Sequence, residues 1–131
     1  MGRDKNTVAT ILLVDDVDEY RNLIKRGLER GGYRVKTAYD ELDAVERAQC
    51  VRPEMILLEM GRMPTLQTLD MGRRVRADSK VGNEVKIVVY ADRPDETVHE
   101  GGEIRLGPNE YVILPEDGDQ LNGFLGRLLT K

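Results

Sequence analysis

The stretch "PEMILLEMGRMP", from Pro53 to Pro64, decides the fold because it combines a buried strand with an acid at the end of that strand. The unbroken apolar run Met55–Leu58 is typical of a strand that is covered on both faces of a parallel sheet. The run leads into a carboxylate, Glu59, and a loop that ends at Pro64 follows. Ligands of parallel sheets bind at the carboxyl ends of the strands, so Glu59 is a candidate functional residue.

Strand-like and helix-like stretches alternate on both sides of this segment. Apolar or β-branched runs predict five strands, at residues 9–14, 33–38, 54–59, 85–91 and 111–114. Helical spacing of apolar residues follows four of them. Between the last two, a helix starting near Pro94 would end within about two turns at Gly101 and Gly102. This (βα)5 order predicts an α/β fold, with a doubly wound five-stranded parallel sheet in three α/β/α layers.

Length and composition limit the class of protein. The 131 residues suffice for one domain, predicted at residues 9–131 after a tail at 1–8. The net charge of −4 and the lack of a long basic run argue against direct nucleic-acid binding. No apolar stretch approaches the ~18 residues that span a bilayer. The single cysteine cannot form an internal disulfide, which favours a reducing compartment, and we expect a cytoplasmic protein.

Acidic residues end two of the predicted strands. Asp15 and Asp16 follow the first strand, and Glu59 ends the third. If these strands are neighbours, three carboxylates converge and repel one another. Either one carboxyl then holds a proton, or a hard cation such as Mg²⁺ joins them.

Several motifs together resemble the receiver domain of two-component response regulators, the CheY-like branch of the flavodoxin-like folds. The resemblance covers about Ala9 to Leu129, and the stretches that carry it are "ILLVDD", "PEMILLEMGRMP", "RRVRAD", "IVVYA" and "YVILPED". It implies that Asp15 and Asp16 are metal-binding acids and that Glu59 stands at the phospho-acceptor position. The expected Mg²⁺ ligands are these three side chains and the backbone carbonyl of Gly61.

Three positions depart from the receiver pattern. Receivers carry an acceptor Asp, a Thr or Ser after the fourth strand and a Lys before the Pro of the fifth. Here Glu59, Tyr90 and Leu114 stand at those positions. Tyr111 retains the aromatic switch position, three residues before the missing Lys. The resemblance also implies a cis peptide bond at Leu114–Pro115.

These departures predict an atypical receiver that is not an enzyme and is not phosphorylated in the usual way. It would act through contacts with a histidine kinase or a downstream signalling protein, as a monomer or weak dimer, and stay in one conformational state. Glu59 would either partly imitate the phosphorylated state or accept backbone N–H groups in its loop. Arg62 and Arg93 are candidate replacements for the missing Lys cation.

Two alternatives remain open. The first is a receiver that still accepts phosphate, on Glu59 or a neighbouring acid. The second is a Mg²⁺-dependent phosphatase, because Asp16 and Asp18 in "DDVD" have the spacing of the nucleophile motif of haloacid-dehalogenase-like enzymes. Tyr20 stands where that motif has Thr or Val, which weighs against the second alternative.

Overall fold

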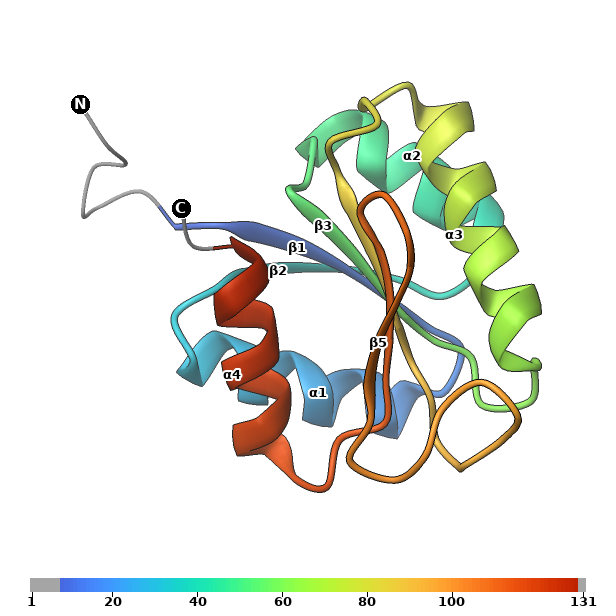
Figure 1. The fold of residues 1–131 in the computed structure, drawn as a ribbon. Helices are drawn as coiled ribbons and strands as arrows, with labels where there is room; N and C mark the ends of the chain where they lie inside the picture. The colour runs from blue at the N-terminus through green and yellow to red at the C-terminus, as the bar shows by residue number, and fades with distance from the viewer. Residues whose placement is uncertain (1–7, 130–131) are drawn as a thin grey trace.

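The structure is a computed structural model that describes residues 8–129, so the predicted tail at 1–8 lies, except for Val8, outside the described residues. Strands and helices alternate through most of this part of the chain (Figure 1). Their bounds are β1 Thr10–Asp15, α1 Asp18–Arg30, β2 Arg34–Ala38, α2 Glu41–Val51, β3 Met55–Glu59, α3 Thr65–Ser79, β4 Lys86–Tyr90, β5 Glu103–Gly107, β6 Glu110–Ile113 and α4 Gly118–Leu129.

The strands form one sheet in the order β2-β1-β3-β4-β6-β5. All neighbouring pairs from β2 to β6 are parallel, and only β5 and β6 are antiparallel. Helices α2 and α3 lie on one face of the sheet, and α1 and α4 lie on the other (Figure 1). The predicted doubly wound α/β/α architecture is therefore confirmed.

Two apolar clusters hold the three layers together, because successive strand side chains point to opposite faces. Leu12 and Leu58 belong to the cluster under α2 and α3. Leu13 and Leu57 belong to the cluster under α1 and α4. Each of the runs "ILLV" and "MILL" thus contributes apolar side chains to both faces of the sheet. This explains why polar and apolar residues do not alternate in either run.

All five predicted strands are present as the parallel part of the sheet, but the sheet also has a sixth strand, β5, that was not predicted. Within residues 8–129, no helix lies between β4 and the next parallel strand, β6. A loop and the strand β5 occupy that part of the chain instead. β5 turns back on β6 through Pro108 and Asn109, and Asn109 adopts a left-handed conformation with φ of 59°. Gly-Pro-Asn between two short runs is a turn signal, and a hairpin needs a shorter connection than a covering helix.

Residue types that favour helix ends stabilise three helix termini. The carboxylate of Asp40 accepts the N–H of Asp43 at 2.8 Å at the start of α2. Asp117 likewise accepts the N–H of Gln120 at 2.8 Å at the start of α4. Gly32, which follows α1, has a φ of 100° that residues other than glycine rarely adopt.

Tyr20 and Leu23 fit the helical spacing of apolar residues in α1, yet both are exposed, and Leu28 alone is fully buried in that helix. The apolar face of α1 therefore contacts the sheet only through its C-terminal part.

The cis peptide bond expected at Leu114–Pro115 is wrong, because the described residues contain no cis peptide bond and this one is trans.

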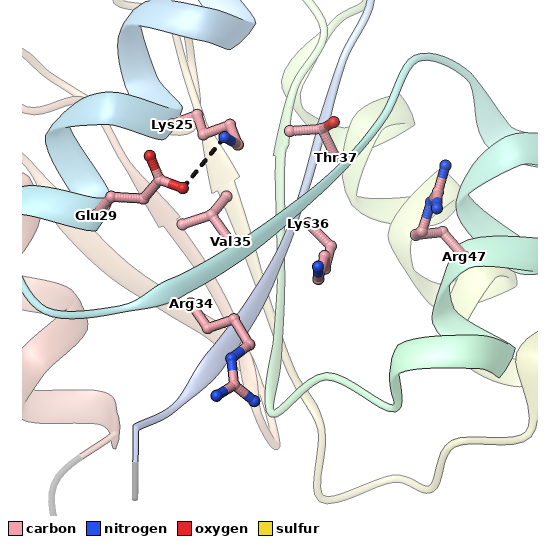
Figure 2. Close-up of a pocket in the computed structure, with 7 residues that line it drawn as sticks. All are labelled: Lys25, Glu29, Arg34, Val35, Lys36, Thr37 and Arg47. Carbon is pink, nitrogen blue, oxygen red and sulfur yellow. Dashed lines mark ion pairs between the residues drawn. The ribbon is translucent and has the colours of Figure 1, made fainter. Parts of the chain in front are cut away.

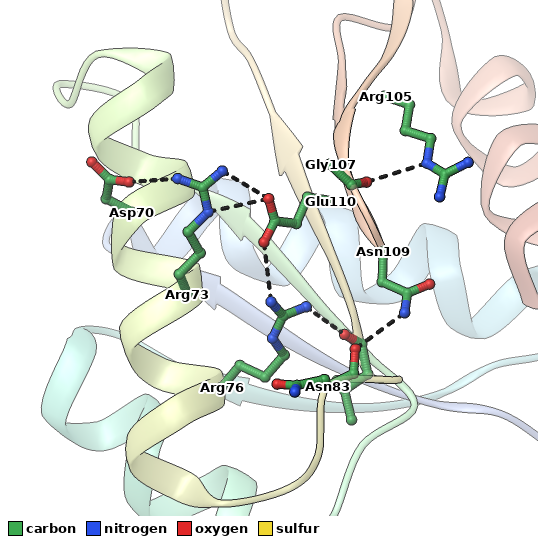
Figure 3. Close-up of polar contacts among 9 residues, drawn as sticks. Asp70, Arg73, Arg76, Asn83, Arg105, Gly107, Asn109 and Glu110 are labelled. Atoms are coloured by element: carbon green, nitrogen blue, oxygen red, sulfur yellow. Dashed lines mark hydrogen bonds and ion pairs between the residues drawn. The ribbon is translucent and has the colours of Figure 1, made fainter.

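An ion network ties α3 to the amino end of β6 (Figure 3). One oxygen of the Glu110 carboxylate accepts the side chain of Arg73 at 2.7 Å, and the other accepts that of Arg76 at 3.0 Å. Arg76 also donates to the carbonyl of Val85 at 3.1 Å, and Arg73 pairs with Asp70 at 2.9 Å. The network fastens the hairpin strand β6 to the helix that packs on β3 and β4.

Candidate functional site

Two acids meet at the carboxyl ends of the central strands. Asp15 ends β1 and Glu59 ends β3, and the two are direct partners in the register of the parallel pair. Both follow a residue of the α2/α3 cluster, so their side chains point to the α1/α4 face. Asp15 is 0% exposed and Glu59 is 5% exposed. The sequence prediction that these two acids converge is therefore confirmed.

The site gives these carboxyls few hydrogen-bond donors. One oxygen of Asp15 accepts the backbone N–H of Val17 at 2.8 Å. The other oxygen, Oδ2, and Oε1 of Glu59 are buried and have no donor among the described residues. An ionised carboxylate can only accept hydrogen bonds, so two such groups face each other favourably only when one of them carries a proton.

The pKa values of both Asp15 and Glu59 are raised by their burial and altered by their closeness to each other. Loss of water, a hydrogen bond with Asp15 and the charge of Asp15 raise the pKa of Glu59 to about 8. The charges of Asp92 and Asp16 add to this rise. Burial also raises the pKa of Asp15, although the hydrogen bond with Glu59 opposes the change. These shifts favour a pair that shares one proton near neutral pH over two ionised carboxylates.

The other expected metal ligands are less enclosed than this pair. Asp16 is exposed, although its charge raises the pKa of both Asp15 and Glu59. The carbonyl of Gly61 lies 3.5 Å from a guanidinium nitrogen of Arg93, a long contact. Residues 8–129 contain no group of three His, Cys, Asp or Glu side chains arranged to hold an ion.

Tyr90, at the position of the hydroxyl residue, ends β4 beside this pair. It packs against the α1/α4 cluster rather than lying free at the surface. Burial and the charge of Glu59 raise the pKa of its phenol. Tyr111, at the aromatic switch position, packs edge-to-face on Phe124 of α4, with ring centroids 6.0 Å apart. Both aromatic positions are therefore anchored to the core under α4.

Leu114, at the position of the missing lysine, serves a different purpose. Its side chain is buried in the α2/α3 cluster, to which Val98 of the β4–β5 loop also belongs. Its backbone pairs with that loop: the N–H of Leu114 donates to Gly102 at 3.0 Å, and its carbonyl accepts the N–H of Gly101 at 2.7 Å. Leu114 therefore fastens the loop that replaces a helix, and its side chain lies in apolar surroundings.

A cation that the sequence interpretation missed lies beside Asp15. Arg21 of α1 donates to the backbone carbonyl of Asp15 at 2.8 Å and pairs with Asp18. Its charge lowers the pKa of Asp15. A helix that begins three residues after the strand brings its first turn back over the strand end, and this spacing could have identified Arg21. Asp18 is held by this pair, not aimed at Glu59.

The predicted stand-in cations lie elsewhere. Arg93 pairs with its neighbour Asp92 at 3.3 Å, and Arg62 is exposed in the β3–α3 loop. Both line a hollow of about 440 Å³ beside the site. The hollow is bounded by Gly61, Arg62, Met63, Pro64, Thr65, Asp92, Arg93 and Asp95. Neither arginine has a contact with Asp15 or Glu59 within residues 8–129.

No helix in residues 8–129 has the length and apolar character needed to cross a membrane. This agrees with the sequence, which has no apolar stretch of that length.

The fold and the site can now be compared with known proteins. The family model of the response regulator receiver domain matches residues 11–123. Response regulator MprA of Mycobacterium ulcerans is 29% identical over 121 residues, which are 92% of this chain and 50% of that relative. The chain thus spans about half the length of the curated relatives it matches.

Solved structures show the same fold. CheY4 of Vibrio cholerae is 23% identical, and the match covers 94% of this chain and 100% of that one with a TM-score of 0.71. The receiver domain of the sensor histidine kinase PA1611 from Pseudomonas aeruginosa is 26% identical, with a TM-score of 0.67. That match covers 95% of this chain and 100% of the other, which holds a magnesium ion in its active site cleft. This chain belongs to the family of response regulator receiver domains.

Proposed function

We propose that this chain is an atypical receiver of a two-component system, one that transmits signals through protein contacts and does not take up phosphate at Glu59 in the usual way. The observation that carries the proposal is the buried Asp15–Glu59 pair, in which Asp15 Oδ2 and Glu59 Oε1 have no partner among the described residues and burial raises the pKa of Glu59 to about 8. A protonated carboxyl is a poor nucleophile, because its lone pairs are less available to an incoming phosphoryl group.

Phosphoryl transfer depends on positioning and on neutralising the charge of the phosphoryl oxygens. Leu114 brings no charge to this site and lies in the apolar cluster under α2 and α3. The extra methylene of Glu59 moves its carboxyl away from the place of an aspartate, and a misplacement of about 1 Å can cost roughly 100-fold in rate. These losses act together, so ordinary phosphorylation of Glu59 would be very slow.

The shared proton also bears on the hypothesis that Glu59 imitates a phosphorylated residue. A phosphoryl group carries about two negative charges near neutral pH. The Asp15–Glu59 pair carries one between its two carboxyls while the proton is held. We infer that Glu59 gives at most a partial imitation, and that the anchored rings of Tyr90 and Tyr111 keep the domain in one state.

Incubation with acetyl phosphate and Mg²⁺, followed by intact-mass measurement, tests the proposal. We expect no added phosphate on the natural chain and none on Glu59→Gln. The matched variant is Glu59→Asp, which restores the acceptor aspartate and leaves Leu114 in its apolar cluster; urea unfolding checks that it folds. Stoichiometric gain of one phosphate by the natural chain, lost in Glu59→Gln, would overturn the proposal.

Mg²⁺ fits the site only in part. Asp15 Oδ2 and Glu59 Oε1 are orphaned buried oxygens that a cation would satisfy, whereas Asp16 is exposed and would have to turn inward. A bound Mg²⁺ would neutralise charge at the strand ends. We infer weak binding, at millimolar Mg²⁺, through Asp15, Asp16, Glu59 and the carbonyl of Gly61.

An NMR titration with MgCl₂ measures this binding. The amides of Asp15 to Val17 should shift with a millimolar midpoint, and Asp16→Asn should weaken the response. An unchanged spectrum of the natural chain throughout the titration would show that these carboxyls do not hold the ion.

The kind of partner can be inferred from the segment that stands in place of the usual fourth helix. The β5–β6 hairpin gives this chain a different surface beside α4 from that of a (βα)5 receiver. We infer a protein partner, a histidine kinase or a downstream signalling protein, that recognises this altered surface. A relative of similar fold is itself part of a sensor histidine kinase. The proposed setting is the cytoplasm, with a monomer or weak dimer that contacts no nucleic acid directly.

A further inference from the structure

The outer edge of β2 has features that the receiver site does not use. β2 is an edge strand of the sheet and pairs only with β1 within residues 8–129. The N–H of Arg34 donates to the carbonyl of Ala9 at 3.0 Å, on the β1 side. Consecutive peptide groups of a strand point in opposite directions, so the N–H and C=O groups of Val35 and Thr37 face the open edge.

A hollow of about 380 Å³ lies along this edge. It is lined by Lys25, Glu29, Arg34, Val35, Lys36, Thr37 and Arg47. Figure 2 shows β2 running between α1, which carries Lys25 and Glu29, and α2, which carries Arg47. The two residues whose backbone groups face outward, Val35 and Thr37, are both part of this lining.

The lining is strongly positive on a chain whose net charge is −4. It contains four cations and one acid, and that acid, Glu29, is already paired with Lys25 at 3.1 Å. The side chains of Arg34, Lys36 and Arg47 have no ion pair or hydrogen bond in the described part of the chain. Three unneutralised cations therefore flank a row of open backbone groups.

We propose that the outer edge of β2 is a docking site for an acidic peptide segment in extended conformation. The segment would add as a further strand, pairing its backbone with Val35 and Thr37, and would direct carboxylates toward Arg34, Lys36 and Arg47. A second copy of this chain presents the same positive edge, so pairing of two β2 edges would be repelled. An acidic partner satisfies both the open backbone groups and the excess positive charge.

Charged side chains on an edge strand can also serve only to prevent aggregation. The two roles differ in what they predict. Protection alone requires that strands, acidic ones included, do not add to the edge. Docking requires that an acidic strand adds in register with the open amides, while a basic strand does not.

The test is an NMR titration of the full chain with a seven-residue peptide that has glutamate at every second position and valine or threonine between. We expect the amides of Val35 and Thr37 to shift and to exchange more slowly with solvent, while that of Lys36, which faces β1, keeps its exchange rate. The same peptide with lysine in place of glutamate should not bind. The double variant Lys36→Glu, Arg47→Glu should weaken binding roughly tenfold or more.

Lys80→Glu is the matched control, because Lys80 is an exposed cation that follows α3 and lies outside the β2 hollow. It should leave the affinity unchanged, and urea unfolding should show that all variants fold. The proposal is overturned if the glutamate peptide leaves β2 unperturbed, or if Lys80→Glu weakens binding as much as the double variant. It is also overturned if a glutamate peptide interrupted by proline, or inorganic triphosphate, binds equally well, since neither can form the strand ladder.

Discussion

Two glutamates are buried at opposite ends of the same sheet and have opposite surroundings. Glu59, at the carboxyl end of β3, faces another acid and has a carboxyl oxygen without a donor. Glu110, at the amino end of β6, is 7% exposed and accepts the guanidinium groups of Arg73 and Arg76 (Figure 3). Burial raises the pKa of both, but the arginines lower that of Glu110 overall.

The difference teaches that partners, and not burial, decide whether a buried acid is charged. Glu110 is an ionised structural acid that joins a helix to a hairpin strand. Glu59 is an acid whose raised pKa favours the uncharged form. It lies at the end of the sheet where the family carries out its chemistry. An engineered or natural change that exchanged their partners would be expected to exchange their charge states as well.

Removing each acid in turn should have the largest effect and should separate the two roles. Glu110→Gln leaves Arg73 and Arg76 facing a neutral amide, and we expect a loss of about 3 kcal/mol in the free energy of unfolding. Glu59→Gln puts a neutral group of similar shape in place of the carboxyl and removes the cost of its raised pKa, so we expect no loss and a gain of up to about 3 kcal/mol at pH 7. Urea unfolding at pH 7 measures both. Equal losses would contradict the comparison.

The pH dependence of stability should show the two acids on opposite sides of pH 4.5, the ordinary value for a glutamate. Glu59 has a folded pKa of about 8, above its ordinary value of 4.5, so between these values the folded chain holds a proton that the unfolded chain has lost. Stability therefore falls as the pH rises toward 8, by up to about 1.4 kcal/mol per pH unit. The pKa of Glu110 is lowered, so its contribution is present above 4.5 and is lost as the pH falls below that value.

Unfolding midpoints measured from about pH 3 to pH 9 test this pair of signs. Glu59→Gln should flatten the profile between about pH 4.5 and 8 and leave the part below about pH 4.5 unchanged, whereas Glu110→Gln should do the reverse. A slope between these two values that survives in Glu59→Gln would mean that another group holds the proton.

The smallest expected effect concerns Arg21, the cation nearest the acid pair. Arg21→Gln removes a charge that lowers the pKa of Asp15, so the Asp15–Glu59 pair should release its shared proton at a higher pH. Side-chain carboxyl signals followed by NMR give this titration. Arg93→Gln is the control, because Arg93 pairs with Asp92 and should leave the titration almost unchanged. Identical curves for Arg21→Gln and the natural chain would show that Arg21 is only structural.

Much of the site was accessible from the sequence, and the missed parts have a common cause. Asp15 and Glu59 could be placed together because apolar runs fix two central strands, and parallel strands end at the same edge. The role of Arg21 could not be read from composition, because it depends on how the first turn of α1 folds back over β1. The different environments of the two adjacent aspartates were equally hidden, since Asp15 is buried at the end of β1 while Asp16, just after the strand, is exposed.

The sequence by itself determined the α/β layers, the parallel core of the sheet and the replacement of three positions that receivers use. These follow from local patterns, namely apolar runs, helix caps and motif spacing. Tertiary structure decided the rest: the sixth strand, the burial of Leu114, the charge of Glu59 and the open positive edge of β2. Each of these depends on which segments become neighbours in the fold. A neighbouring segment brings charge and excludes water, and neither effect can be deduced from a single stretch of sequence.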